Sequence, residues 1–296
     1  MEIVNMRTKD GIALKGLLYE SFVNNEICLF IPGCCGNFVD NDFMRIISEI
    51  LYENGYNVLC ANTRGSFMMN SSFHPYNLER PKKIGVAYEK FEDCVNDIDG
   101  WISYLKDRGY SSVNVISHSS GANKLIYYMN CNLENKQLIN KIVMLSPPDF
   151  MNRIRCYPDF QDLVNEATNN IINGEPDKMM KIHFFYKTSQ SFIDMIKSKN
   201  FDNLPLVNGN EKDFEQYAKI DKPIVVICGS EEKYIKNYAD KFIKYAAPGN
   251  QVEFYVINKA DHIYFGKEHV VAYQIIIGLS KLRNNMQYQS KKLKLK

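Results

Sequence analysis

The sequence S-H-S-S-G at residues 117–121 lies between a strand-like apolar run and a helix-like segment. Where a strand turns sharply into a helix at such a sequence, the side chain of the central residue of the turn points outwards. The turn G-x-S-x-G presents a nucleophilic serine in this way. Small side chains are needed two residues before and two residues after that serine, because the backbone is crowded there. Ser119 meets this condition, with Ser117 and Gly121 at the crowded positions. Ser120 does not meet it, because a histidine would then occupy one of them.

A serine hydroxyl attacks a carbonyl group slowly unless an imidazole takes its proton and a carboxylate orients that imidazole. In the strand–turn–helix setting these groups follow in the chain order serine, acid, histidine. His262 comes after the strand-like residues 252–257 and is expected at the carboxyl edge of the sheet, where ligands bind. His74 precedes the serine, His118 is directed elsewhere by the turn, and His183 lies outside the sheet pattern. We therefore expect His262 to be the base.

Several carboxylates are candidates for the acid that orients this histidine. Glu232 is the third residue after Gly229, at the end of a strand-like apolar run, where the known form of this element reads G-x-x-D. A glutamate does the work of an aspartate with one methylene of extra reach. Asp149, which follows the preceding strand-like run, is the alternative acid, and Glu231 and Asp261 are further candidates.

The elements that must position these side chains alternate along the chain. Short apolar runs and segments of helical period follow one another, which is typical of βαβ units around a mostly parallel sheet. Asp10-Gly11 predicts an antiparallel hairpin at the start. We expect strands at residues 27–31, 58–61, 113–116, 142–145, 224–228 and 252–257, and helices at residues 43–51, 91–105, 122–129 and 271–282.

Residues 150–215 interrupt this alternation. They are rich in phenylalanine, methionine and isoleucine, a composition that argues against disorder. We expect a helical cap inserted into an α/β core made of residues 1–149 and 216–296. The cap either adds to the core or supplies an apolar pocket for an acyl or aromatic group.

Composition and charge exclude several classes of protein. The 296 residues carry 36 Lys+Arg and 34 Asp+Glu, a net charge of +2, so nucleic-acid binding is not expected. The basic residues 291–296 are expected to form a solvated tail. No segment reaches the roughly 18 apolar residues of a membrane span, so membrane insertion is not expected. Residues 1–7 do not have the pattern of a signal peptide.

The eight cysteines contain no CxxC pair, and several lie in strand-like apolar runs. In a chain of this length they are expected to be reduced thiols of a cytoplasmic protein. Cys34-Cys35 could act as a nucleophile or hold a metal ion, but no second cluster of ligands accompanies them. We therefore expect neither a metal ion nor a cofactor.

Five blocks of the sequence together resemble the α/β-hydrolase superfamily over nearly the whole chain. The resemblance is to cytoplasmic esterases, lipases and serine aminopeptidases, and it implies an eight-stranded, mostly parallel sheet with helices on both faces. The blocks are residues 31–38, 62–65, 117–124, 229–232 and 260–262.

The resemblance also implies an oxyanion hole made by the backbone N–H groups of Cys34 and Ser120. Two such fixed donors stabilise the tetrahedral oxygen, and loss of one typically costs about 3–4 kcal/mol of barrier. The chain departs from the family pattern at two positions. Pro32-Gly33 stands where the family usually has His-Gly, and Ser117 stands where it has glycine.

These residues predict a serine hydrolase, most simply a carboxylesterase, that cleaves a small ester, thioester or amide through an acyl-enzyme intermediate. Its partner would be a small-molecule acyl substrate. An acyltransferase or thioesterase that tailors a natural product is the alternative, as is a serine peptidase with the same catalytic residues. A non-catalytic binding protein would not need the serine, the histidine and the acid together.

Overall fold

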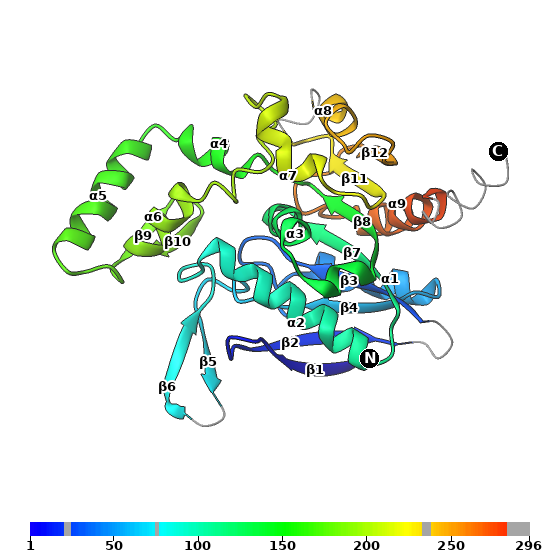
Figure 1. Cartoon of the computed structure of the whole chain (residues 1–296), viewed down its shortest axis with the longest axis horizontal. Coiled ribbons are helices and arrows are strands. Elements are labelled where there is room, and N and C mark those ends of the chain that lie inside the picture. The colour runs from blue at the N-terminus through cyan, green and yellow to red at the C-terminus, as the bar shows by residue number, and fades with distance from the viewer. Residues whose placement is uncertain (21–24, 75–76, 233–237, 283–296) are drawn as a thin grey trace.

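The computed structural model describes residues 1–20, 25–74, 77–232 and 238–282, and its centre is an eight-stranded sheet (Figure 1). The strand order is β1-β2-β4-β3-β7-β8-β11-β12. The first two strands form the predicted hairpin and pair antiparallel, as does β2 with β4, and all other neighbours are parallel. The predicted, mostly parallel sheet is confirmed. Its strands are β1 (Glu2–Arg7), β2 (Ala13–Tyr19), β3 (Glu26–Ile31), β4 (Asn57–Ala61), β7 (Ser112–His118), β8 (Ile139–Leu145), β11 (Ile224–Gly229) and β12 (Val252–Ile257).

Helices cover both faces of the sheet, because successive side chains of a strand point to opposite faces. In β3, Leu29 packs with the helices of one face, and Cys28 and Phe30 pack with those of the other. One face carries α2 (Cys94–Asp107), α3 (Ser120–Asn130) and α8 (Ala239–Lys244), and the other carries α1 (Asp42–Glu53) and α9 (Glu268–Lys281). None of the helices in the described residues combines the length and the apolar character that a bilayer span requires.

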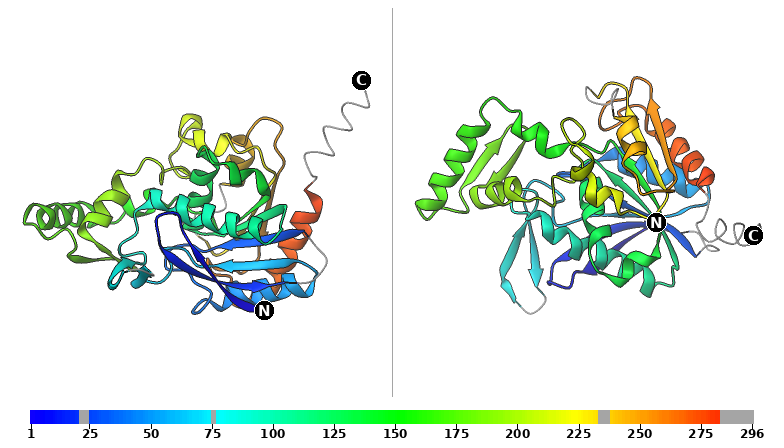
Figure 2. Two further views of the ribbon diagram at one scale, coloured as in Figure 1. Left: turned by 60° about the horizontal axis from the view of Figure 1, so that its bottom comes forward. Right: turned by 45° about the horizontal axis from the view of Figure 1, so that its top comes forward.

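The first part of the segment between β8 and β11 stands to one side of the sheet, as both views of Figure 2 show, whereas its last part packs on the sheet core. It contains the expected helices and also a hairpin, β9–β10, which the sequence analysis did not predict. We call its part from Phe150 to Lys197 the cap. The elements are α4 (Phe150–Arg155), α5 (Phe160–Ile172), β9 (Met179–Ile182), β10 (Phe185–Thr188) and α6 (Ser189–Lys197), followed by a 3-10 helix (Glu211–Phe214) and α7 (Glu215–Ala218).

The cap has an apolar cluster of its own, which also includes two residues of the core, Val86 and Phe91. Phe201 stacks between Phe91 and Phe150, with ring centroids at 4.2 and 4.8 Å. We call this set the cap cluster: Val86, Phe91, Phe150, Met151, Ile154, Leu163, Ala167, Met180, Ile182, Phe185, Phe192, Ile193, Met195 and Phe201. The aromatic residues therefore join the cap to the core.

Hydrogen bonds fix one end of the cap to the core loop at residues 86–89. The buried Lys187 ammonium donates to the carbonyl oxygens of Val86 (2.9 Å) and Glu89 (3.2 Å). The backbone N–H of Thr188 donates to Ala87 (2.8 Å), and the Ser191 hydroxyl donates to Glu89 (2.7 Å). The β10–α6 part of the cap is thus bound directly to the core.

A second hairpin, β5 (Asn70–His74) and β6 (Asn77–Ile84), projects from the core after the loop that contains Arg64. The Arg64 side chain is buried, and its Nε donates to Asp97 (2.9 Å). Its two terminal nitrogens donate to Asp10 (both 2.9 Å), in the turn between β1 and β2. Arg64 therefore ties three separate segments of the core together.

We expect Arg64→Met to lower the free energy of unfolding by about 3–5 kcal/mol, because it leaves the fully buried Asp97 carboxylate without its partner. Urea unfolding measures this change. Arg108→Met is the matched control, because its ion pairs with Glu2 and Glu20 are largely exposed and contribute at most about 1 kcal/mol. Equal losses of unfolding free energy in the two variants would show that burial does not make the Arg64 ion pairs more stabilising than the exposed ion pairs of Arg108.

Candidate active site

The turn between β7 and α3 holds Ser119 in a positive-φ conformation, φ 52° and ψ −132°. The backbone around it is crowded, as expected. A Cβ atom at Gly121 would lie 2.6 Å from the carbonyl oxygen of Pro32, so only glycine fits without movement. Ser117 is accommodated, because its hydroxyl is buried and donates to the carbonyl oxygen of Val143 (3.1 Å).

Ser119, His262 and Glu232 meet at the carboxyl edge of the sheet, from the loops after β7, β12 and β11. The distance from Ser119 Oγ to His262 Nε2 is 2.9 Å, and that from His262 Nδ1 to Glu232 Oε2 is 2.8 Å. Because a carboxylate only accepts, Nδ1–H donates to Glu232 and Nε2 is left to accept from the serine hydroxyl. Ser119 is buried, whereas 35% of the His262 side chain is exposed.

The other candidate acids have different partners. Asp149, the alternative acid of the sequence analysis, caps α4 and accepts from the backbone N–H groups of Asn152 (3.2 Å) and Val207 (2.8 Å). Burial raises the pKa of Asp149. Asp261 accepts from two backbone N–H groups of its own turn, and Glu231 bonds the neighbouring serine hydroxyl. The structure therefore brings Glu232, and not Asp149, to the imidazole.

Ser146 and Tyr264 support Glu232 from behind, and the sequence analysis did not identify them. The Ser146 hydroxyl donates to Glu232 Oε1 (2.5 Å), which also accepts from the N–H of Gly229 (2.9 Å). The Tyr264 hydroxyl lies 2.8 Å from Ser146 Oγ and donates to the carbonyl oxygen of Ile227 (2.7 Å). Ser146 directly follows an apolar strand, so its place at this edge was a signal available in the sequence.

We expect Ser146→Ala to lower kcat about tenfold, because a hydrogen bond to a charged group contributes about 1.5–3 kcal/mol. Steady-state kinetics on a p-nitrophenyl ester measures this loss. Tyr264→Phe is the control, because it leaves the Ser146–Glu232 hydrogen bond in place. An unchanged kcat in Ser146→Ala would exclude this role.

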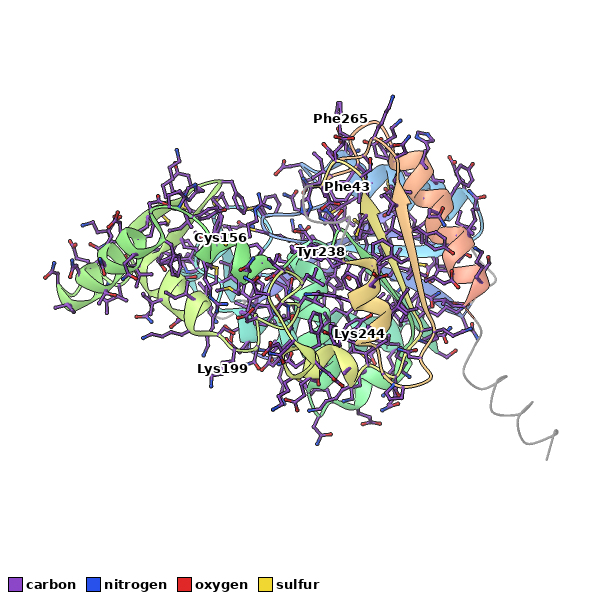
Figure 3. All side chains as sticks on the ribbon, turned by 90° about the horizontal axis from the view of Figure 1, so that it is seen from above. Phe43, Cys156, Lys199, Tyr238, Lys244 and Phe265 are labelled. Carbon is purple, nitrogen blue, oxygen red and sulfur yellow. The ribbon has the colours of Figure 1, made fainter. Side chains whose placement is uncertain are left out.

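His118 has a separate structural position next to His262. Its Nε2–H donates to the backbone carbonyl oxygen of His262 (2.8 Å). Its ring packs against that of Phe43, which is labelled in Figure 3, with ring centroids 4.7 Å apart. Burial lowers the pKa of His118 to about 3, so this imidazole is neutral at pH 7. His118 therefore fixes the backbone of the loop that carries His262.

The two predicted oxyanion donors, the backbone N–H groups of Cys34 and Ser120, belong to segments that adjoin Ser119. Ser120 is the first residue of α3, where a backbone N–H has no acceptor within the helix. Cys34 follows Gly33, at which a Cβ atom would lie only 2.7 Å from the Cβ of Ser119. The backbone before Cys34 therefore touches the serine residue, and the β3 loop and the α3 N-terminus both adjoin its side chain.

A cavity of about 60 Å³ lies next to His262 and Glu232, between the core and the start of the cap. It reaches both the His262 and Glu232 side chains, so a small group could approach the imidazole from this side. The cavity is lined by Pro147, Pro148, Asp149, Asn152, Arg153, Leu206, Val207, Glu232, Tyr238 and His262.

Solved structures share this architecture over almost the whole chain. Est1E from Butyrivibrio proteoclasticus, solved with ferulic acid bound, is 15% identical, with a TM-score of 0.63 and coverage of 93% of this chain and 99% of that one. An esterase from Pyrococcus furiosus is 19% identical, with a TM-score of 0.56 and coverage of 95% and 90%. The chain has the α/β-hydrolase fold.

Among other structures with this α/β-hydrolase fold, dienelactone hydrolase from Anabaena variabilis is 13% identical, with a TM-score of 0.55 and coverage of 93% and 94%. A scan against protein-family models finds no match, and a search of curated protein sequences finds none either. The predicted resemblance to the α/β-hydrolase superfamily is confirmed at the level of the fold.

Proposed function

We propose that the protein is a serine hydrolase of the carboxylesterase type, which cleaves a small ester, thioester or amide through an acyl-enzyme intermediate. The observation that carries this proposal is the continuous hydrogen-bond chain from Ser119 through His262 to Glu232, at 2.9 and 2.8 Å. The esterases among the similar structures support it. A protein that only binds a ligand would not need this series of hydrogen bonds.

In the proposed reaction, Ser119 Oγ attacks the substrate carbonyl carbon while His262 Nε2 takes the hydroxyl proton. Glu232 stabilises the imidazolium that forms and keeps its orientation. The backbone N–H groups of Cys34 and Ser120 stabilise the negative oxygen. The imidazolium then protonates the leaving group, and the acyl group remains on Ser119. Water, deprotonated by His262, releases the acid and regenerates the serine.

The substrate class follows from the surroundings of the serine. We propose a small-molecule acyl substrate whose apolar or aromatic acyl group is received next to the cap cluster, because Cys34 and Cys35 pack against that cluster. The inserted residues 150–215, which include the cap, would then select the acyl group. All eight cysteines are free thiols, which supports a reducing compartment such as the cytoplasm.

A fluorophosphonate probe tests the nucleophile directly, because it forms a stable bond with an activated serine. We expect one adduct per chain, located on Ser119 by peptide mapping. Turnover is tested with p-nitrophenyl esters of increasing acyl length, a feruloyl ester, an acyl thioester and aminoacyl amides. An unlabelled protein with no turnover on this panel would refute the proposal, and amide turnover alone would indicate a peptidase.

A further inference from the structure

Cys34 and Cys35 carry neighbouring thiols on the loop that follows β3, directly after Gly33. Gly33 packs so closely against Ser119 that a Cβ atom on the glycine would lie 2.7 Å from the Cβ of the serine. Cys35 has a left-handed conformation, φ 59°, and its carbonyl oxygen accepts from the N–H of Phe67 (3.1 Å). The loop is thus held from two sides, and the proposed function makes no use of either sulfur atom.

These two thiols differ from the deeply buried cysteines of the chain. Both are partly exposed, and their sulfur atoms lie 3.8 Å apart. The Cys34 thiol donates to the Cys35 sulfur, which lowers the pKa of Cys35 and raises that of Cys34. Lys124 and Lys187 also lower the pKa of Cys35, whereas burial and Glu89 oppose this effect. Cys35 is therefore the more reactive thiol of the pair. Burial raises the pKa of Cys28, Cys60, Cys94 and Cys228.

The separation of the sulfur atoms fits one bridging atom better than a disulfide. The two sulfurs are already in contact, so a single atom bonded to both could bridge them with a small movement of the side chains. A disulfide requires about 2.05 Å between the sulfurs and usually about 4.4–6.8 Å between the Cα atoms. Neighbouring Cα atoms across a trans peptide are only about 3.8 Å apart. A bridge through one atom therefore leaves the loop nearly unchanged, whereas a disulfide would distort it.

The number of protein ligands available limits which kind of atom could bridge the two cysteine sulfurs. In the described part of the chain, no group of three or more His, Cys, Asp or Glu side chains could hold a metal ion. A structural zinc ion usually takes four protein ligands. An organic trivalent arsenic needs only two thiols from the protein, because its third bond is to its own carbon substituent.

We propose that Cys34 and Cys35 form a capture site for organic trivalent arsenicals, and that capture blocks the active site. Two As–S bonds replace the bonds from arsenic to oxygen, and that oxygen leaves as water with the two thiol protons. Arsenic stays trivalent, so no oxidant is needed. Both cysteines pack against the cap cluster, and Cys34 directly follows Gly33, which lies against Ser119, so we expect the bulk of the arsenic substituent to obstruct the approach to the serine. The blocking rests on the proposed function, whereas the capture does not.

Phenylarsine oxide, added at one equivalent to the reduced protein, tests both parts. We expect the intact mass to rise by the mass of the reagent less one water, and ester hydrolysis to be lost. The dithiol 2,3-dimercaptopropanol should remove the adduct and restore hydrolysis, whereas a monothiol at the same thiol concentration should do neither. Cys34→Ser and Cys35→Ser should each fail to retain the reagent, because one sulfur forms only a labile adduct.

Cys156→Ser and Cys131→Ser are the matched controls and should retain the adduct. Cys156 is exposed at the end of α4 (Figure 3), and Cys131 is partly exposed at the end of α3. A dithiol-reversible adduct that persists in Cys34→Ser and Cys35→Ser would overturn the site. An adduct on the wild type that leaves the hydrolysis rate unchanged would overturn the blocking. Where the wild type hydrolyses no ester, the mass measurement still decides capture, and fluorophosphonate labelling separately decides the proposed function.

Discussion

Ser119→Ala is expected to lower kcat for ester hydrolysis by about 10⁶-fold, because the variant has no nucleophile for His262 to activate. The remaining rate comes from the oxyanion donors and from substrate binding. Steady-state and single-turnover kinetics on the best ester of the panel measure the loss. The Ser119 hydroxyl bonds the partly exposed His262 ring and supports no buried polar group. The urea midpoint should therefore stay close to that of the wild type.

Ser117→Ala is the matched control for this variant. It removes a hydroxyl two residues away, whose hydrogen bond goes to the carbonyl oxygen of Val143. Most of the activity should remain, since this hydroxyl is outside the proposed reaction. Wild-type hydrolysis by a folded Ser119→Ala protein would overturn the assignment of the nucleophile.

Glu232→Gln is expected to lower kcat by about 10⁴-fold with little change in KM. A glutamine amide can donate to Nδ1 of His262, which favours the tautomer with the proton on Nε2. In that tautomer Nε2 cannot accept the proton of the Ser119 hydroxyl. Kinetics with the same ester measures the effect, and circular dichroism checks the fold.

Asp149→Asn decides between the two acids that the sequence left open. Asparagine can still cap α4, so the fold should persist, and the absence of contact between Asp149 and His262 predicts nearly wild-type kcat. The opposite pattern, with a large loss in Asp149→Asn and little loss in Glu232→Gln, would show that Asp149 orients the imidazole.

The sheet was predictable because its signals are local. Most of the parallel strands contain an apolar run that is buried on both faces, such as Val225 to Cys228, and that ends in turn residues. The order of the strands then brings Ser119, Glu232 and His262 to the same edge, although 143 residues separate the first from the last. Chain order together with the place of His262 just after a strand was therefore sufficient to select it.

The hairpin β9–β10 and the support of Glu232 were harder to predict. The hairpin turns at His183-Phe184, where His183 has φ 51°, and the turn lacks the glycine or asparagine that usually marks such a conformation. Asp149 and Glu232 both follow strands, and only the long-range contact of Val207 with Asp149 shows which acid is engaged elsewhere. Such contacts between distant residues leave no periodic signal in the sequence.

The attachment of the cap through Lys187, Thr188 and Ser191 has a consequence for substrate access. A rigid-body swing of the whole cap would break four hydrogen bonds to residues 86–89, two of them made by a buried ammonium group. This side therefore acts as a fixed wall. We expect the cavity beside His262 to widen from the side of α4, which supplies Asn152 and Arg153 to its lining, and mutagenesis aimed at admitting bulkier esters should begin there.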